Sequence, residues 1–271
     1  MSLRLDLRAE STLPMALTGL TPSSVSRWSL SQIERFAASI GNDLVALAEL
    51  FAVSGDPSDL AIEIAGDIPN ARWIGAMMTE GTIRVEGSVG RHAGALMSGG
   101  ELIVNGNAGD WLGREMKGGR IRVSGNAGDF VAASLPGERR GMTSGEIFID
   151  GNAGDEIGRR MRRGLIVVGG AAGDSVGLDL LAGTILVFGR CGPRPGIGMR
   201  RGTIGLFGEP PELPLSFRQS GRTEPVFMRV LLKHLRQTGF AAAEPFLDSE
   251  YHSFDGDLLS LGKGEILIRI S

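Results

Sequence analysis

The sequence repeats itself with a period of nineteen residues through its central part. Blocks of the pattern apolar-x-apolar-x-Gly end at Gly66, Gly87, Gly106, Gly125, Gly151, Gly170, Gly189 and Gly208. Five of the seven successive spacings are 19 residues, and the other two, 21 and 26, are longer. A fixed period with occasional longer intervals predicts a solenoid in which loops are inserted into a constant frame.

The high glycine content indicates what kind of solenoid this is. Glycine accounts for 42 of the 271 residues, about twice the usual share. Helical repeats are excluded because each glycine inside a helix costs ~1 kcal/mol. A short strand between glycine turns can instead pair with its own copies ~4.8 Å above and below. We therefore predict a mainly β protein, a parallel β-helix of about seven coils, for residues 61–208.

Equivalent positions in successive coils form columns with a defined chemistry. An aliphatic column predicted to face the interior comprises Ile83, Leu102, Ile121, Ile147, Ile166, Ile185 and Ile204. A second column, predicted to fill a corner of the coil, comprises Met78, Met97, Met116, Met142, Met161, Leu180 and Met199. A third column, predicted to form turns, comprises Gly81, Gly100, Gly119, Gly145, Gly164, Gly183 and Gly202.

Residues 1–60 are predicted to form a helical N-terminal cap. Ser31 and Glu34 have the spacing of a capping box that opens a first helix. Gly41 and Asn42 separate it from a second helix through Leu44, Leu47 and Phe51. Such a cap would cover the open end of the solenoid.

Residues 209–271 are predicted to form a C-terminal extension with a helix and a strand. The helix covers residues 225–237 and carries one apolar face, formed by Phe227, Val230, Leu231 and Leu235. A turn and a strand follow from Gly262 to the end of the chain.

Two polar columns are candidates for metal binding or for structural hydrogen bonds. One contains Asp110, Asp129, Asp155 and Asp174, and the other contains Asn107, Asn126 and Asn152. Calcium-binding β-roll repeats are nine residues long, unlike these coils. We therefore expect the aspartates to cap backbone N–H groups of their own turns and the asparagines to form a structural ladder.

No catalytic motif is found in the sequence. His92, His234 and His252 are scattered and form no metal-binding or triad spacing, and the single Cys191 excludes an intramolecular disulfide. The glycines belong to the repeat rather than to a nucleotide-binding turn between a strand and a helix. We predict no catalytic residue, no metal ligand and no cofactor bound by this chain alone.

Arginine is the residue type most suggestive of binding. The chain has 25 arginines and only three lysines, and guanidinium groups suit carboxylates and phosphates. By spacing, Arg114, Arg140 and Arg159 fall in one column, and Arg162 shares another with Lys117 and Arg200. Arg140, Arg159 and Arg162 are the candidate binding residues for a ligand or an acidic partner, and a solvated face is the alternative.

Composition limits the cellular setting. No apolar run is long enough to span a membrane, and the N-terminal residues lack the apolar core of a signal peptide. The sequence pI of about 5.7 argues against a general nucleic-acid binder. We expect a cytoplasmic protein.

The repeat Gly-x-x-Met-x-x-Gly-x-Ile-x-Val-x-Gly-Asn-Ala-Gly-Asp resembles a known glycine-rich β-helix domain. That domain is shared by glutamate synthase large subunits and by the C subunit of formylmethanofuran dehydrogenase. The flanking residues resemble this C-subunit family over nearly the whole chain, and within it the C subunit of the bacterial formyltransferase/hydrolase complex most closely. They include Leu50-Phe51-Ala52-Val53-Ser54-Gly55, Gly141-Met142, Leu215-Ser216-Phe217 and Gly262-Lys263-Gly264-Glu265-Ile266-Leu267.

The resemblance implies a right-handed coil and a structural role in one-carbon metabolism of methylotrophs. In such a complex a hydrolase subunit of amidohydrolase fold, which carries the metal, and a formyltransferase subunit act together. They pass a formyl group from tetrahydromethanopterin through a methanofuran-type carrier to water, releasing formate. The C subunit is non-catalytic in that scheme and contacts the other subunits, and the carrier bears glutamate carboxylates that arginines could bind.

Four alternatives remain open on the sequence. The chain could be the C subunit of a molybdenum- or tungsten-dependent formylmethanofuran dehydrogenase. It could also be a glutamate-synthase-type β-helix domain or an anion-binding scaffold. An acyltransferase with a left-handed β-helix is the enzyme alternative, but its hexapeptide repeat would give eighteen-residue coils.

Overall fold

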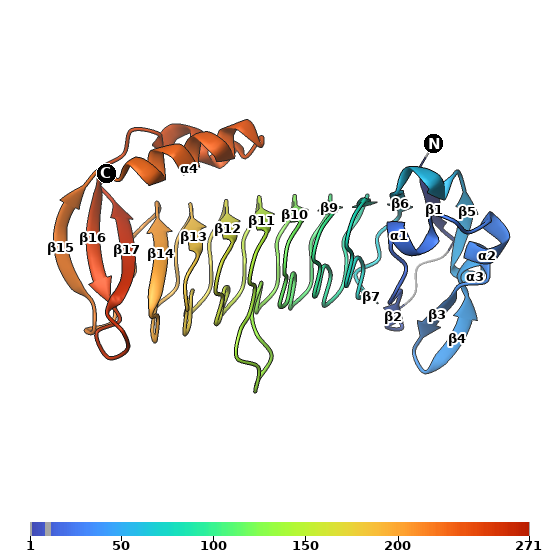
Figure 1. The fold of residues 1–271 in the computed structure, drawn as a ribbon, viewed down its shortest axis with the longest axis horizontal. Helices are drawn as coiled ribbons and strands as arrows, with labels where there is room; N and C mark the ends of the chain where they lie inside the picture. The colour runs from blue at the N-terminus through green and yellow to red at the C-terminus, as the bar shows by residue number, and fades with distance from the viewer. Residues whose placement is uncertain (1, 9–11, 271) are drawn as a thin grey trace.

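A long, mostly parallel sheet runs the length of the molecule (Figure 1). The computed structural model describes residues 2–8 and 12–270. Within them, the central strands lie side by side in chain order, each parallel to the next. These strands are β6 (Ala61–Ala65), β8 (Thr82–Val85), β9 (Glu101–Val104), β10 (Arg120–Val123), β11 (Glu146–Ile149), β12 (Leu165–Val168), β13 (Thr184–Val187) and β14 (Arg201–Leu206).

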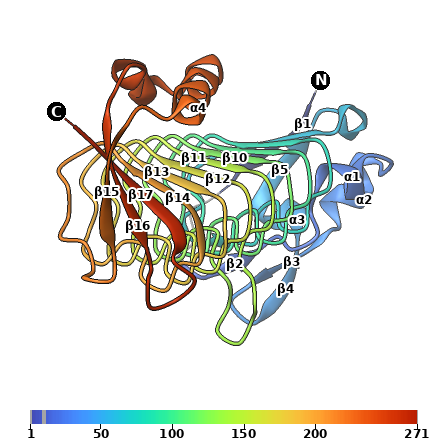
Figure 2. The same ribbon diagram turned by 60° about the vertical axis from the view of Figure 1, so that its left-hand side comes forward.

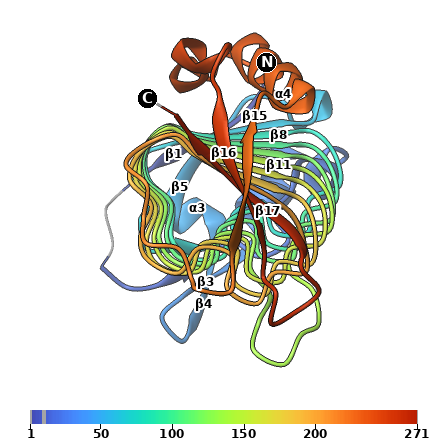
Figure 3. The same ribbon diagram turned by 90° about the vertical axis from the view of Figure 1, so that its left-hand side faces the viewer.

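The strand register follows the nineteen-residue period. Ile83 pairs with Leu102, and Leu102 pairs with Ile121. A second parallel ladder of isolated bridges, which includes Val89 to Ala108 and Ala108 to Ala127, lies on another side of the coil. The view along the molecule shows successive turns of the chain superposed (Figure 3). The chain therefore closes one circuit per repeat, and the hand of the coil stays a prediction.

The predicted interior columns are confirmed. Every residue of the aliphatic column and every residue of the methionine column is at most 1% exposed. An unbranched methionine fits the corner because its side chain can adapt to an irregular space. None of the helices in the described residues is long and apolar enough to cross a membrane.

The longest interval in the repeat contains a loop inserted between Ser134 and Met142. Ala132 donates its backbone N–H to the carbonyl of Leu112, and Gly158 donates to that of Val131. Ala132 therefore occupies the position that Gly113 and Gly158 hold in the neighbouring coils, with a left-handed φ of 59°. Met142 then resumes the frame, and the inserted residues form the green loop that projects below the coils in Figure 1.

The N-terminal segment is richer in strands than predicted, so a helical cap is wrong for this region. Two of its strands, β1 (Leu3–Leu7) and β5 (Phe51–Ser54), extend the long sheet beyond β6. A second sheet contains β2 (Met15–Ala16), β3 (Ala37–Ile40), β4 (Asp43–Ala46) and β7 (Ala71–Arg72). The helices are short: α1 (Pro22–Val25), α2 (Leu30–Glu34), α3 (Leu47–Leu50) and the 3-10 turn η1 (Pro57–Asp59).

Local chemistry explains this difference. Gly41 and Asn42 form the two-residue loop of a hairpin, in which Ile40 pairs with Asp43, rather than a break between two helices. Gly-Asn loops of this length are a hairpin signal because Gly41 can adopt its φ of 58°. The capping box is formed by Ser29 and Gln32, two residues before the predicted pair.

The C-terminal residues close the other end of the sheet. β17 (Lys263–Arg269) lies parallel to β14, and β16 (Tyr251–Gly256) and β15 (Arg218–Thr223) continue the sheet antiparallel. The predicted strand near the end of the chain is thus confirmed. Between β15 and β16 the chain forms α4 (Val226–Gln237) and the 3-10 helix η2 (Ala241–Phe246), which lie over the outer surface of the coils (Figure 2).

Helix α4 is present as predicted, and half of its predicted apolar face, Leu231 and Leu235, packs against the sheet. Met228, Leu232 and Leu235 are buried against an outer aromatic and aliphatic cluster of the sheet. Phe227 and Val230, predicted to pack, are 45% and 61% exposed. Apolar residues surround most of this helix, so the sequence alone does not show which stripe meets the sheet. The cluster on the sheet is formed by Phe148, Leu165, Val167, Leu186, Phe188, Phe207 and Leu267.

Candidate binding surface

The three candidate arginines lie near one corner of the coil but do not form one stack. Arg140 lies on the inserted loop and is exposed, and Ala133 takes the place in the column that spacing assigned to Arg140. Arg159 stays in the column of Arg114 and is half-buried, with its Nη1 3.1 Å from Oε2 of Glu156. Arg162 is exposed on the next side of the coil, between Thr143 and Leu181 in its column.

The corner beside Arg114 carries a row of rings that sequence reasoning missed. Trp73, His92, Trp111 and Phe130 occupy equivalent positions in four consecutive coils, and we call this row the aromatic corner. Their φ angles lie between 63° and 65°, a left-handed conformation unusual for bulky residues. Spacings of 19 residues between them were visible in the sequence, but one of the four is a histidine, which hid the pattern.

The rings of the aromatic corner stack on one another. The ring centroids are 4.3 Å apart for Trp73 and His92, 6.2 Å for His92 and Trp111, and 4.5 Å for Trp111 and Phe130. The interplanar angles are 13°, 24° and 19°. The ring faces are therefore turned toward one another along the coil axis.

A positive field surrounds this corner. Burial, followed by the charges of Arg114, Arg72 and Arg91, lowers the pKa of His92 to about 4 against the opposing effect of Asp110. His92 is therefore neutral near pH 7. The guanidinium of Arg114 lies 5.2 Å from the centroid of the Trp73 ring, a cation–π contact.

The aspartate and asparagine columns join successive coils. Oδ1 of Asp110 accepts the backbone N–H of Asp129, and Asp129 and Asp155 accept in the same way from the next aspartate in the column. The expectation that each aspartate caps its own turn is therefore wrong, because the acceptor serves the next coil. The asparagines follow the same rule, with Asn107 accepting the N–H of Asn126. In the described residues no group of three or more acidic, histidine or cysteine side chains could hold a metal ion.

Outside this corner, Glu146 is paired with two basic side chains and Cys191 is buried. His234 on α4 lies 3.0 Å from Oε1 of Glu146, and Arg120 donates to Oε2 of the same carboxylate at 2.8 Å. Burial raises the pKa of Glu146, but these hydrogen bonds outweigh it and leave the pKa below its usual value. Burial raises the pKa of the Cys191 thiol to about 12. That thiol is therefore protonated near pH 7 and a poor nucleophile.

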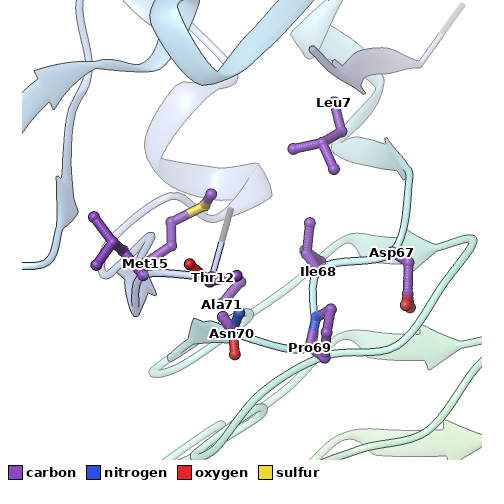
Figure 4. Close-up of a pocket in the computed structure, with 9 residues that line it drawn as sticks. Leu7, Thr12, Met15, Asp67, Ile68, Pro69, Asn70 and Ala71 are labelled. Carbon is purple, nitrogen blue, oxygen red and sulfur yellow. The ribbon is translucent and has the colours of Figure 1, made fainter. Parts of the chain in front are cut away.

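A cavity of about 340 Å³ lies where the N-terminal segment meets the first coil (Figure 4). It is lined by apolar side chains such as Leu7, Met15 and Ile68, together with Asp67. Oδ1 of Asp67 accepts the backbone N–H of Ser88. This carboxylate therefore serves the polar ladder between coils, and among the described residues that line the cavity no second titratable side chain accompanies it.

Comparison with known proteins agrees with the repeat and the fold. The family described as the GXGXG motif matches residues 59–249. A stretch of 81 residues is 37% identical to the C subunit of the tungsten-containing formylmethanofuran dehydrogenase 2 of Methanothermobacter marburgensis. The corresponding subunit of Methanothermobacter thermautotrophicus is 36% identical over 81 residues. Each of these matches covers 28% of this chain and 30% of the relative's length.

A solved structure resembles the chain over its whole length. It is a chain in the crystal structure of the formyltransferase/hydrolase complex (FhcABCD) from Methylorubrum extorquens in complex with methylofuran. The TM-score is 0.90 and the sequence identity 33%, with 99% of this chain and 100% of that chain covered. The chain therefore belongs to the GXGXG motif family, within which it is a homologue of the C subunit of formylmethanofuran dehydrogenase and of a chain of the bacterial formyltransferase/hydrolase complex.

Proposed function

We propose that this chain is a non-catalytic structural subunit of a formyltransferase/hydrolase complex. The proposed complex transfers a formyl group from tetrahydromethanopterin through a methanofuran-type carrier to water and releases formate. The observation that carries the proposal is the full-length match to a chain of the complex solved with methylofuran. The non-catalytic role is supported by the sequence, which contains no catalytic motif.

The shape of the molecule supports a role in holding partners at fixed positions. Backbone ladders and the side-chain oxygens of the aspartate and asparagine columns join each coil to the next. A stack of this kind offers several long faces at constant geometry. The proposed partners are the hydrolase subunit, which would hold the metal, and the formyltransferase subunit.

Reconstitution tests the proposed role. The complex would be purified through a tag on this chain, and the same subunits would be purified from cells that lack it. We expect the isolated chain to show no turnover of formylated carrier, and the subunits without it to lose assembly or activity. Turnover by the isolated chain at the rate of the complex would refute the non-catalytic role. Full assembly and activity without the chain would refute the structural one.

We further propose that Arg140, Arg159 and Arg162 contact the carrier or an acidic partner. Their support is position, since two are exposed and all three lie near one corner of the central coils. Replacing all three by serine should leave the circular dichroism spectrum unchanged while weakening assembly or raising KM for the carrier. The matched control replaces three exposed arginines elsewhere, Arg84, Arg222 and Arg236, by serine. Equal behaviour of the two triple variants would make the candidate arginines part of a solvated face.

A metal-dependent formylmethanofuran dehydrogenase is the second candidate function. It is favoured by the 37% identity to the C subunit of the tungsten-containing enzyme over 81 residues. Elemental analysis of the native complex separates the two candidates. Stoichiometric tungsten or molybdenum in the purified assembly would favour the dehydrogenase, and formate release without either metal would favour the hydrolase.

A further inference from the structure

Arg114 is a nearly buried cation without an anion. Its residue is 8% exposed, and among the described residues no carboxylate lies within ion-pair distance of its guanidinium. Its Nε is buried and has no hydrogen-bond partner there. Removing a charge from water is costly unless a counter-charge or hydrogen bonds replace the water. The contact with the Trp73 ring supplies part of this compensation, and the guanidinium still has no counter-charge among the described residues.

Among the described residues, three arginines and one carboxylate, Asp110, act on His92, so the charge around the aromatic corner is unbalanced. Asp110 is paired with Arg91, with Oδ2 and Nη2 3.0 Å apart. Arg72 is exposed and forms no ion pair within the described part of the chain. The corner therefore carries excess positive charge next to its rings, which favours an acidic partner.

The arrangement of the rings favours a polypeptide over a flat ligand. Sugars and nucleobases bind by stacking on free ring faces, but here the faces of the inner rings already contact their neighbours. The stack presents ring edges, which carry partial positive charge and suit carboxylates and carbonyl oxygens. Met77 beside it is 52% exposed and adds apolar surface. Three coil steps of ~4.8 Å span ~14 Å, the length of about four extended residues.

We infer that the aromatic corner and Arg114 form a docking surface for an acidic segment of a partner subunit. A carboxylate of that segment accepts hydrogen bonds from Arg114, a second acidic group faces Arg72, and apolar side chains cover the ring edges and Met77. Tryptophan and arginine at the centre of a partly desolvated patch are typical of the residues that dominate interface energies. The inference rests on the proposed role of this chain as a subunit of a complex.

Dissociation constants for the remaining subunits of the complex test this inference. The variants are Arg114→Gln, which removes the unpaired charge, and Arg72→Glu, which reverses an exposed charge. Each should bind the remaining subunits at least ~10-fold more weakly than the wild type. The effect of Arg72→Glu should shrink at high salt because exposed charges are screened. A photo-crosslinking residue at Met77 should label a peptide of the partner that contains aspartate or glutamate.

Two matched controls isolate the docking surface. Arg269→Gln removes another arginine with an unpartnered Nε, 4.8 Å from the ring of Phe246 at the C-terminal end. Arg84→Glu reverses an exposed charge in the coil of Trp73, on strand β8. Both controls should bind within about 2-fold of the wild type, well below the loss expected at an interface centre. If circular dichroism shows that Arg114→Gln does not fold, the dissociation constant of Arg72→Glu and the crosslink from Met77 test the docking surface instead.

The outcomes separate this inference from the proposed function. If the wild type binds the other subunits and both variants bind equally well, the docking surface is refuted and the proposed function stands. If the wild type binds no subunit, both are refuted. If the variants keep subunit affinity but raise KM for the carrier, the corner is a ligand site and the inference is wrong.

Discussion

The turn glycines hold each coil at the close spacing that backbone pairing requires. Gly119 has a φ of 85°, and a β-carbon at this position would lie 2.7 Å from the carbonyl oxygen of Gly100 in the preceding coil. Any side chain would therefore need both a strained backbone and a local separation of two coils. We expect Gly119→Val to lower the free energy of unfolding by ~2 kcal/mol or more, measured by equilibrium denaturation.

A control variant separates the cost of backbone strain from the cost of pushing two coils apart. Gly137 on the inserted loop has a similar φ of 91°, but a β-carbon there would have no atom within 4 Å. Gly137→Val should therefore cost clearly less than Gly119→Val. Equal losses would mean that backbone strain alone, rather than contact between coils, explains the need for glycine.

At the residue scale the sequence predicts columns well and exceptions poorly. The aliphatic and methionine columns are buried as expected because their spacing alone defines them. Within the inserted interval, spacing counted from the closing glycine placed Arg140 beside Arg114. The loop in fact begins only after Ser134, so Ala133 takes that place. A count cannot locate an insertion, and only the hydrogen bonds between coils do so.

At the scale of elements, helix α4 is held to the sheet by polar contacts at its C-terminal half. Glu146 on β11 accepts hydrogen bonds from His234 and Arg120. Glu146→Gln keeps the size of the side chain and removes its charge, so we expect the attachment of α4 to weaken by ~1 kcal/mol. Amide protection factors across Val226–Gln237 at pH 7 should fall. Glu101→Gln is the control, since that carboxylate lies 3.9 Å from Arg120 and forms no ion pair or side-chain hydrogen bond with α4 in the described residues.

The same carboxylate predicts how the attachment depends on pH. Against the opposing effect of burial, hydrogen bonds from Arg120 and from His234 lower the folded pKa of Glu146. Because His234 lies on α4, its hydrogen bond favours the charged carboxylate when the helix is attached. This contribution is fully present above the unfolded pKa of ~4.3 and is lost as the pH falls through the folded pKa. Wild-type protection in α4, corrected for intrinsic exchange, should therefore begin to fall toward that of Glu146→Gln once the pH drops below ~4.3. A wild-type advantage that is the same at pH 3 as at pH 7 would contradict this assignment.

The elements that the sequence predicts best are those with a strong periodic signal. Helix α4 and the coil strands have such a signal. The N-terminal hairpin of β3 and β4 does not, because its strands have four residues each and only one of them, Ala38, is buried. Its apolar residues also fit a helical spacing, so the two-residue Gly41–Asn42 loop was the better signal. The face of α4 depends on the sheet beneath it, which no local pattern contains.

At the scale of the whole molecule, the nineteen-residue frame makes a coil a removable unit. Ile83 pairs with Leu102 and Leu102 with Ile121, so the ends of one coil match the start of the next. Deleting residues 88–106 joins Gly87 to Asn107 and lets β8 pair with β10 in the same register. We expect this variant to fold with an unchanged circular dichroism spectrum and to be shorter by ~4.8 Å in solution scattering.

The period itself is tested by a deletion that is one residue shorter. Removing residues 88–105 leaves Gly106 as an extra residue in the turn, which must bulge out or shift the register of β8. A one-residue shift would turn the buried side chains of β8 outward, so a bulge costs less free energy than a shift. The bulge would still disturb the neighbouring polar ladder. The 18-residue deletion should therefore unfold at a lower denaturant concentration than the 19-residue deletion, although it removes less of the chain. Equal midpoints would show that the turns, rather than a fixed frame, absorb differences in coil length.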